Sequence, residues 1–174
     1  MQNNIWFKEI PGAGWADNPF LIETLCQAKA IAYWPKPYYC YREETPEKAA
    51  ALAKRDPLMP FNRWNDMVDI LERLNVTDPA VWTPQITRGF TYMGIMIEHT
   101  GIEGHPEIER AIHKMFERMP QELVFANPRV TPAAKKLYAE YMALPILKSV
   151  TARTPRTSWA RACITYGTRA PSRL

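Results

Sequence analysis

The chain has 174 residues, of which 47% are apolar and 23% are charged, and its formal net charge is +4. This composition is typical of a globular domain with one hydrophobic core. No run approaches the roughly 18 apolar residues that a membrane-spanning helix needs, and the N-terminus lacks the basic start and apolar centre of a secretory signal. The three cysteines have no metal-ligand spacing, so we expect reduced thiols in a cytoplasmic protein.

The positive charge is concentrated at the C-terminal end. Six cations and no acid follow Glu140, whereas the preceding part carries 16 basic and 18 acidic residues. We predict three regions: an α/β piece at 1–45, a helical region at 46–148 and a basic, flexible tail at 149–174. The tail is either a disordered terminus, which we favour, or a segment whose charge gives weak contact with an anionic membrane surface or nucleic acid.

The N-terminal region begins with a predicted strand and loop. Ile5, Phe7 and Ile10 indicate a short strand over residues 4–10. The sequence Pro-Gly-Ala-Gly at 11–14 then predicts a loop, because its glycine spacing fits neither the dinucleotide-binding motif nor the P-loop.

A helix is predicted to follow at Asn18-Pro19, because Asn is a favourable N-cap and Pro suits the first helical position. Asp17 then lies one residue outside the helix and is not needed as a cap. Its carboxylate can point into a cleft and interact favourably with the helix dipole. The predicted apolar face of this helix consists of Phe20, Leu21, Thr24, Leu25 and Ala28.

Two more strands are predicted at 30–34 and 38–42, where Tyr and Trp are frequent. These short N-terminal strands are too few for a stable sheet alone, so we expect them to belong to the edge of a sheet whose other strands are missing or come from elsewhere. The predicted fold class is α+β, mostly α.

The rest of the chain is predicted to be helical, and prolines mark most of the helix starts. Helices are expected at 46–55, from Phe61, from Pro79, from Pro106 and from Pro132, with Pro84 kinking or dividing the third and Gly101 and Gly104 ending it.

Residues 4–42 resemble the C-terminal part of the catalytic domain of bacterial family 2 glycosyltransferases, inverting nucleotide-sugar enzymes of the GT-A fold. The matching features are Ile-Trp-Phe at 5–7, Pro-Gly-Ala-Gly-Trp-Ala-Asp-Asn-Pro-Phe at 11–20, Gln-Ala-Lys-Ala-Ile at 27–31 and Tyr-Tyr-Cys-Tyr-Arg at 38–42. The helical remainder resembles the C-terminal extension of the family less specifically. The resemblance implies that the N-terminal piece is GT-A-like.

The resemblance also implies a role for Asp17, because the family has an acidic residue beside the acceptor at the matching place. Asp17 is therefore the candidate catalytic base, although a structural acid at the start of a helix is an equally good interpretation of the spacing alone. Trp15, Tyr41 and Arg42 are the candidate substrate-binding residues. Packing or a surface ion pair is the simpler explanation for each of these three.

The family's donor-binding half is expected to be absent. The chain has no Asp-x-Asp motif, and Ala16 stands where the family usually has a second acid. We therefore expect a fragment or truncated gene product that is inactive alone, whose nucleotide-sugar donor, carbohydrate acceptor and Mg²⁺ or Mn²⁺ meet only in a complete enzyme. No metal site or cofactor is assigned to this chain.

A second hypothesis is a non-catalytic helical interaction module with a basic tail. It would work through exposed apolar faces or through the charge of the tail. Homo-oligomers are compatible with either hypothesis, and a nucleic-acid partner is not expected. The expected location is the cytoplasm, or the inner face of the membrane if the tail contacts anionic lipid.

Overall fold

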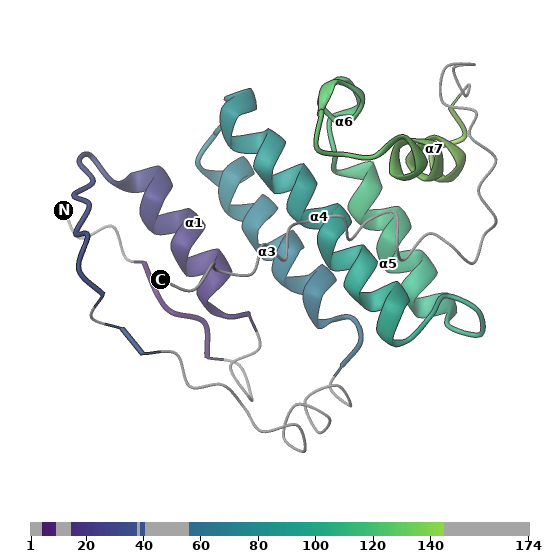
Figure 1. The fold of residues 1–174 in the computed structure, drawn as a ribbon, viewed down its shortest axis with the longest axis horizontal. Coiled ribbons are helices and arrows are strands. Elements are labelled where there is room, and N and C mark those ends of the chain that lie inside the picture. Colours follow the sequence, from purple (N-terminus) through teal and green to yellow (C-terminus); the bar gives the residue numbers. More distant parts are fainter. Residues whose placement is uncertain (1–4, 10–14, 38, 41–55, 145–174) are drawn as a thin grey trace, which may run out of the picture. The chain divides into compact units, whose positions relative to one another are not determined.

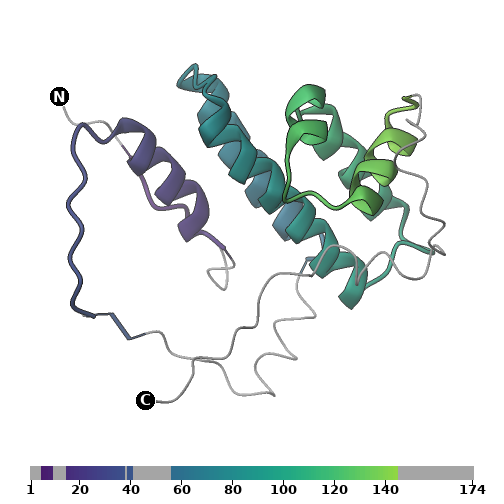
Figure 2. The same ribbon diagram turned by 45° about the horizontal axis from the view of Figure 1, so that its top comes forward.

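The computed structural model describes residues 5–9, 15–37, 39–40 and 56–144. Within these residues the chain forms helices joined by irregular segments and no strand (Figures 1 and 2). None of the described helices is long and apolar enough to cross a membrane. The helices are α1 Asp17–Gln27, α3 Met59–Arg73, α4 Pro79–His99, α5 Pro106–Glu117, α6 Gln121–Ala126 and α7 Pro132–Tyr141.

The predicted α+β fold class, with its GT-A-like β-strand/helix piece, is wrong for the described part of the chain. The described residues of the predicted strands at 4–10 and 30–34 are irregular and form no ladder. A strand needs a neighbour to pair with its N–H and C=O groups, and the described chain supplies none. Most of the predicted strand at 38–42 and all of the predicted helix at 46–55 lie outside the described residues.

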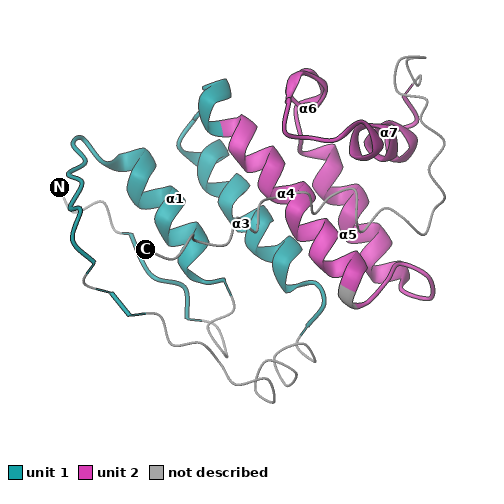
Figure 3. Ribbon diagram, in the orientation of Figure 1, with its two compact units in different colours: residues 1–81 teal, residues 82–174 magenta. Residues whose placement is uncertain are grey.

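The chain divides into two compact units, residues 1–81 and 82–174, and the boundary falls within α4 (Figure 3). In the first unit α1 packs against α3. The predicted helix from Phe61 is observed as α3, and its apolar side chains recur every three or four residues and are buried. These buried side chains are Phe61, Trp64, Met67, Val68 and Leu71.

The predicted apolar face of α1 is only partly buried. Leu21 and Leu25, one helical turn apart, are 47% and 45% exposed. Phe20 is half-buried, and its ring lies 5.4 Å from that of Phe7. The buried residue of α1 is Pro19. The spacing of the apolar residues therefore predicted the helix correctly. It did not predict how much of the apolar face is buried by the rest of the chain.

Helix α4 runs without interruption through Pro84, so the predicted division there is wrong. Proline lacks the N–H that would bond to the carbonyl four residues earlier. Because Pro84 lies in the second turn of α4, only the carbonyl of Ala80 loses its helical partner. Gly101 follows the helix with φ of 82°, a left-handed conformation that suits glycine after a helix end, as predicted.

The core of the second unit is built around aromatic side chains. The Phe116 ring lies 5.3 Å from Phe90, 5.2 Å from Tyr138 and 5.6 Å from Tyr141. The Tyr138 hydroxyl donates a hydrogen bond to the carbonyl of Met119 at 3.1 Å, so this buried polar group is satisfied. These contacts join α4, α5 and α7 within one core.

Two polar contacts fix the ends of α6 and α7. The predicted start of α7 is confirmed: Thr131 Oγ1 accepts a hydrogen bond from the Ala134 N–H at 3.2 Å. The short α6 was not predicted, because six residues are too few to show a helical period. A side chain of α7 caps the C-terminal end of α6: Lys135 Nζ donates a hydrogen bond to the carbonyl of Phe125 at 2.7 Å.

Asn127 ties α4 to the chain between α6 and α7. This buried amide donates to the Thr83 carbonyl at 3.1 Å and to Thr87 Oγ1 at 3.0 Å, and it accepts from the Arg129 N–H at 2.9 Å. Asn127→Ala is expected to lower the free energy of unfolding by about 1–3 kcal/mol, because it leaves buried polar groups without partners. Urea unfolding followed by circular dichroism measures this. The exposed control Asn62→Ala should change it by less than about 0.5 kcal/mol, and an equal loss in both variants would contradict the role of Asn127.

Tyr138 predicts a pH dependence of stability. Burial raises the pKa of its hydroxyl, and the nearby Glu122 charge raises it further. In the unfolded chain the hydroxyl loses its proton near its ordinary pKa of 10.0, before the folded chain does, so its contribution is complete below that pH and is lost as the pH rises further. Tyr138→Phe should therefore cost about 1 kcal/mol at about pH 8 and less at about pH 11. The exposed control Tyr33→Phe should show no such trend, and a constant difference for Tyr138→Phe would contradict the assignment.

Candidate functional site

The N-terminal end of α1 holds two of the four predicted site residues, Trp15 and Asp17. Trp15 has φ of 57°, a left-handed backbone conformation that a residue with a bulky side chain rarely adopts. The Asn18 N–H donates to the Trp15 carbonyl at 3.3 Å, which closes a turn that leads directly into the helix. Backbone strain of this kind gathers at functional sites, where the surrounding structure holds it in place.

The predicted cap at Asn18 is wrong. Helix α1 begins at Asp17, its N-cap is Ala16, and no side chain caps it. Pro19 remains compatible with this start because the first N–H groups of a helix have no helical partner. The turn at Trp15 makes the helix begin two residues earlier in the chain than predicted. Preferences of single residues do not reveal such a turn.

Asp17 remains available for chemistry despite this correction. Its side chain is exposed and makes no hydrogen bond or ion pair with any other described residue. As the first residue of α1, it lies at the positive end of the helix dipole, which interacts favourably with a carboxylate. A free carboxylate in this place can accept a proton from a bound hydroxyl group.

Helix α1 is held in place by contacts on α3. Glu23 in α1 forms an ion pair with Arg73 in α3, and it also accepts a hydrogen bond from Gln27 at 3.1 Å. This pair fixes the helix from which Asp17 and Trp15 are presented. Tyr41 and Arg42, the other two predicted site residues, lie outside the described residues.

A polar cluster on α3 was not predicted. Asp66 receives Lys8 Nζ at 2.6 Å on one carboxylate oxygen and lies 3.0 Å from Arg63 Nη2 on the other. Arg63 and Asp66 form an ion pair without a well-aligned hydrogen bond. Asp66 Oδ2 has no hydrogen-bond partner of good geometry among the described residues. The spacing of Arg63 and Asp66, three residues apart on a helix, was the available signal. The cluster joins segment 5–9 to α3.

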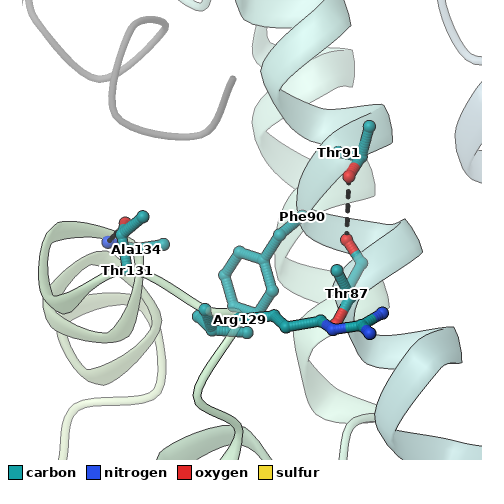
Figure 4. Close-up of a pocket in the computed structure, with 7 residues that line it drawn as sticks. Thr87, Phe90, Thr91, Arg129, Thr131 and Ala134 are labelled. Atoms are coloured by element: carbon teal, nitrogen blue, oxygen red, sulfur yellow. Dashed lines mark hydrogen bonds between the residues drawn. The ribbon is translucent and has the colours of Figure 1, made fainter. Parts of the chain in front are cut away.

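A small cavity lies in the described part of the second unit. This cavity between α4 and the chain leading into α7 has space of about 10 Å³ for the centre of a water-sized molecule, which is the lower limit for one water (Figure 4). Its lining includes Phe90, Arg129 and the Thr87–Thr91 turn, where Thr91 Oγ1 donates to the Thr87 carbonyl at 3.0 Å. This space is too small for a sugar or a nucleotide.

Two histidines, His105 and His113, pair with neighbouring acids. His105 Nδ1 lies 3.0 Å from Glu107 Oε1, and His113 Nδ1 lies 3.3 Å from Glu117 Oε1. The pKa of Glu107 is lowered by a hydrogen bond from its own backbone N–H and then by His105. In the part of the chain that is described, no group of three His, Cys, Asp or Glu side chains is placed to hold a metal ion.

Comparison of the chain with protein-family models, curated proteins and solved structures finds no match. The candidate site therefore depends on the residues themselves. The features that define it are the strained turn at Trp15 and the exposed carboxylate of Asp17.

The Asp66 cluster yields a stability prediction. Asp66→Asn is expected to lower the free energy of unfolding by about 1–3 kcal/mol, because it leaves the buried Arg63 guanidinium without its counter-charge. Lys8→Gln removes only a solvent-exposed partner and should cost less than about 1 kcal/mol. Urea titration of both variants measures the difference, and equal effects would show that Arg63 does not depend on Asp66.

Proposed function

We propose that this chain supplies the acceptor-binding side of an inverting, nucleotide-sugar-dependent glycosyltransferase of bacterial surface polysaccharide or glycoconjugate synthesis, with Asp17 as the catalytic base. The observation that supports this most is the Asp17 carboxylate, which is exposed at the start of α1 and engaged by no other described residue. The sequence around it, Trp-Ala-Asp-Asn-Pro-Phe at 15–20, carries the resemblance to family 2 glycosyltransferases. The proposal does not require the GT-A-like piece that the structure excludes for the described residues.

The proposed chemistry needs one carboxylate from this chain. Asp17 takes the proton of an acceptor hydroxyl while that oxygen attacks the anomeric carbon of the donor sugar. The new C–O bond forms as the bond to the nucleoside diphosphate breaks, and the leaving diphosphate keeps the electron pair. Inversion at the anomeric carbon follows from a single displacement.

Trp15 is proposed to orient the acceptor. Its indole is half-exposed and two residues from Asp17, so a sugar ring stacked on its face would lie close to the carboxylate. Tyr41 and Arg42 are proposed to line the same cleft, with Arg42 reaching the donor diphosphate. The nucleotide-binding groups and the divalent metal that offsets the diphosphate charge are proposed to come from a partner polypeptide or another segment.

The role of Asp17 can be tested in cells whose own copy of the gene is replaced by a variant. Asp17→Asn should lower sugar transfer in extracts by about 100-fold or more, because general base catalysis contributes about 10²–10⁴-fold. The free energy of unfolding of the purified variant should fall by no more than about 1 kcal/mol, because the exposed carboxylate contacts no other described residue and loses only its interaction with the helix dipole.

The matched control is Glu9→Gln, which removes an exposed acid from the same unit. It should leave transfer unchanged. Full transfer by Asp17→Asn would exclude Asp17 as the base and would favour the alternative of a non-catalytic helical interaction module.

A further inference from the structure

Residues 28–37 and 39–40 follow α1, and we call them the aromatic segment. Every described residue in it is exposed. Its large apolar side chains are 66–87% exposed, far more than a folded protein usually leaves in water over so short a stretch. These side chains are Ile31, Tyr33, Trp34 and Tyr39.

We propose that the aromatic segment docks into an apolar groove on a partner polypeptide whose rim carries carboxylates. This proposal does not rest on the catalytic role of Asp17. It depends on the exposed apolar area, the charge and the unpaired backbone of the segment.

The exposed area is large enough for an interface. Aromatic side chains bury about 150–250 Å² each, so four large apolar residues at these exposures offer on the order of 600 Å². Two such surfaces make about 1,200 Å², which is the lower limit for specific, stable protein–protein interfaces. Trp and Tyr are also the residues most enriched among those that dominate binding energy.

The charge of the segment selects the partner. Lys29 and Lys36 are exposed, and the segment contains no acid. A symmetric dimer formed through this segment would bring the same cations towards each other, which is unfavourable at a desolvated interface. A groove with an acidic rim satisfies both lysines while it covers the aromatic rings.

The backbone distinguishes a polypeptide partner from a lipid surface. Residues 29–37 and 39–40 make no hydrogen bond with any other described residue. Pro35 and Pro37 also prevent the amphipathic helix by which most peripheral segments enter a membrane interface. Unpaired N–H and C=O groups are costly in lipid, but another polypeptide can pair with them.

The test begins with a photo-cross-linking residue at position 33 of the full chain, expressed in the cells from which the sequence comes. Cross-linked peptides identify the partner and the residues that surround the segment. The partner is then purified and titrated with the full chain by calorimetry. We expect cross-links to apolar residues flanked by Asp or Glu on one polypeptide.

Variants then define the contacts. The double variant Tyr33→Ser/Trp34→Ser should weaken binding by at least about 10-fold, in line with the loss of two aromatic anchors. Leu21→Ser, an exposed apolar control on α1, should change it by less than about 2-fold. Lys29→Gln/Lys36→Gln should weaken binding at low salt, and this difference should vanish at high salt.

Other results would overturn the proposal. Cross-links to a second copy, with a dimer in sedimentation that the double variant disrupts, would show self-association. Binding to vesicles of phosphatidylcholine and phosphatidylserine that the double variant abolishes would show a lipid surface. No cross-linked protein, or an unchanged affinity of the double variant, would show that the segment has no partner of this kind.

Discussion

The packing of α1 on α3 is the constraint on which the candidate site depends. Helix α1 has 11 residues, and isolated helices shorter than about 12–15 residues are marginal in water. Its stability therefore comes from tertiary contacts: its packing on α3, the Glu23–Arg73 ion pair and the Phe7–Phe20 ring contact. The packing of α1 on α3 holds Asp17 and Trp15 in place, and α3 is itself anchored by its buried apolar side chains.

Proline-marked helix starts were the most predictable part of the fold. Pro79, Pro106 and Pro132 each begin a helix, and the buried face of α3 follows the helical period. These features depend on local chemistry, which a single sequence contains. The strands at 4–10 and 30–34 were predicted incorrectly because a strand depends on pairing with distant chain, which alternation of residue types does not guarantee.

The residues of the candidate site were chosen from the sequence, and their role stays a prediction, whereas the local backbone around them was not predicted. The sequence pointed to Asp17 and Trp15. The strained turn that moves the first helical residue from Pro19 to Asp17 is a backbone property that residue preferences do not show. The Lys8–Asp66 contact joins residues 58 positions apart, so no local pattern predicts it. The Asp17 side chain and the described residues of the aromatic segment are both exposed to solvent. Both features lie in the first unit.

The central claim is that the Trp15–Asp17 end of α1 contacts a carbohydrate acceptor. Titration of the isotope-labelled chain with saccharides selected on a glycan array, followed by backbone amide NMR, tests it most directly. The account predicts saturable shifts confined to residues 15–20 and their neighbours on α1, which Trp15→Ala abolishes. Saturable shifts that leave these residues unchanged, or that persist in Trp15→Ala, would contradict it.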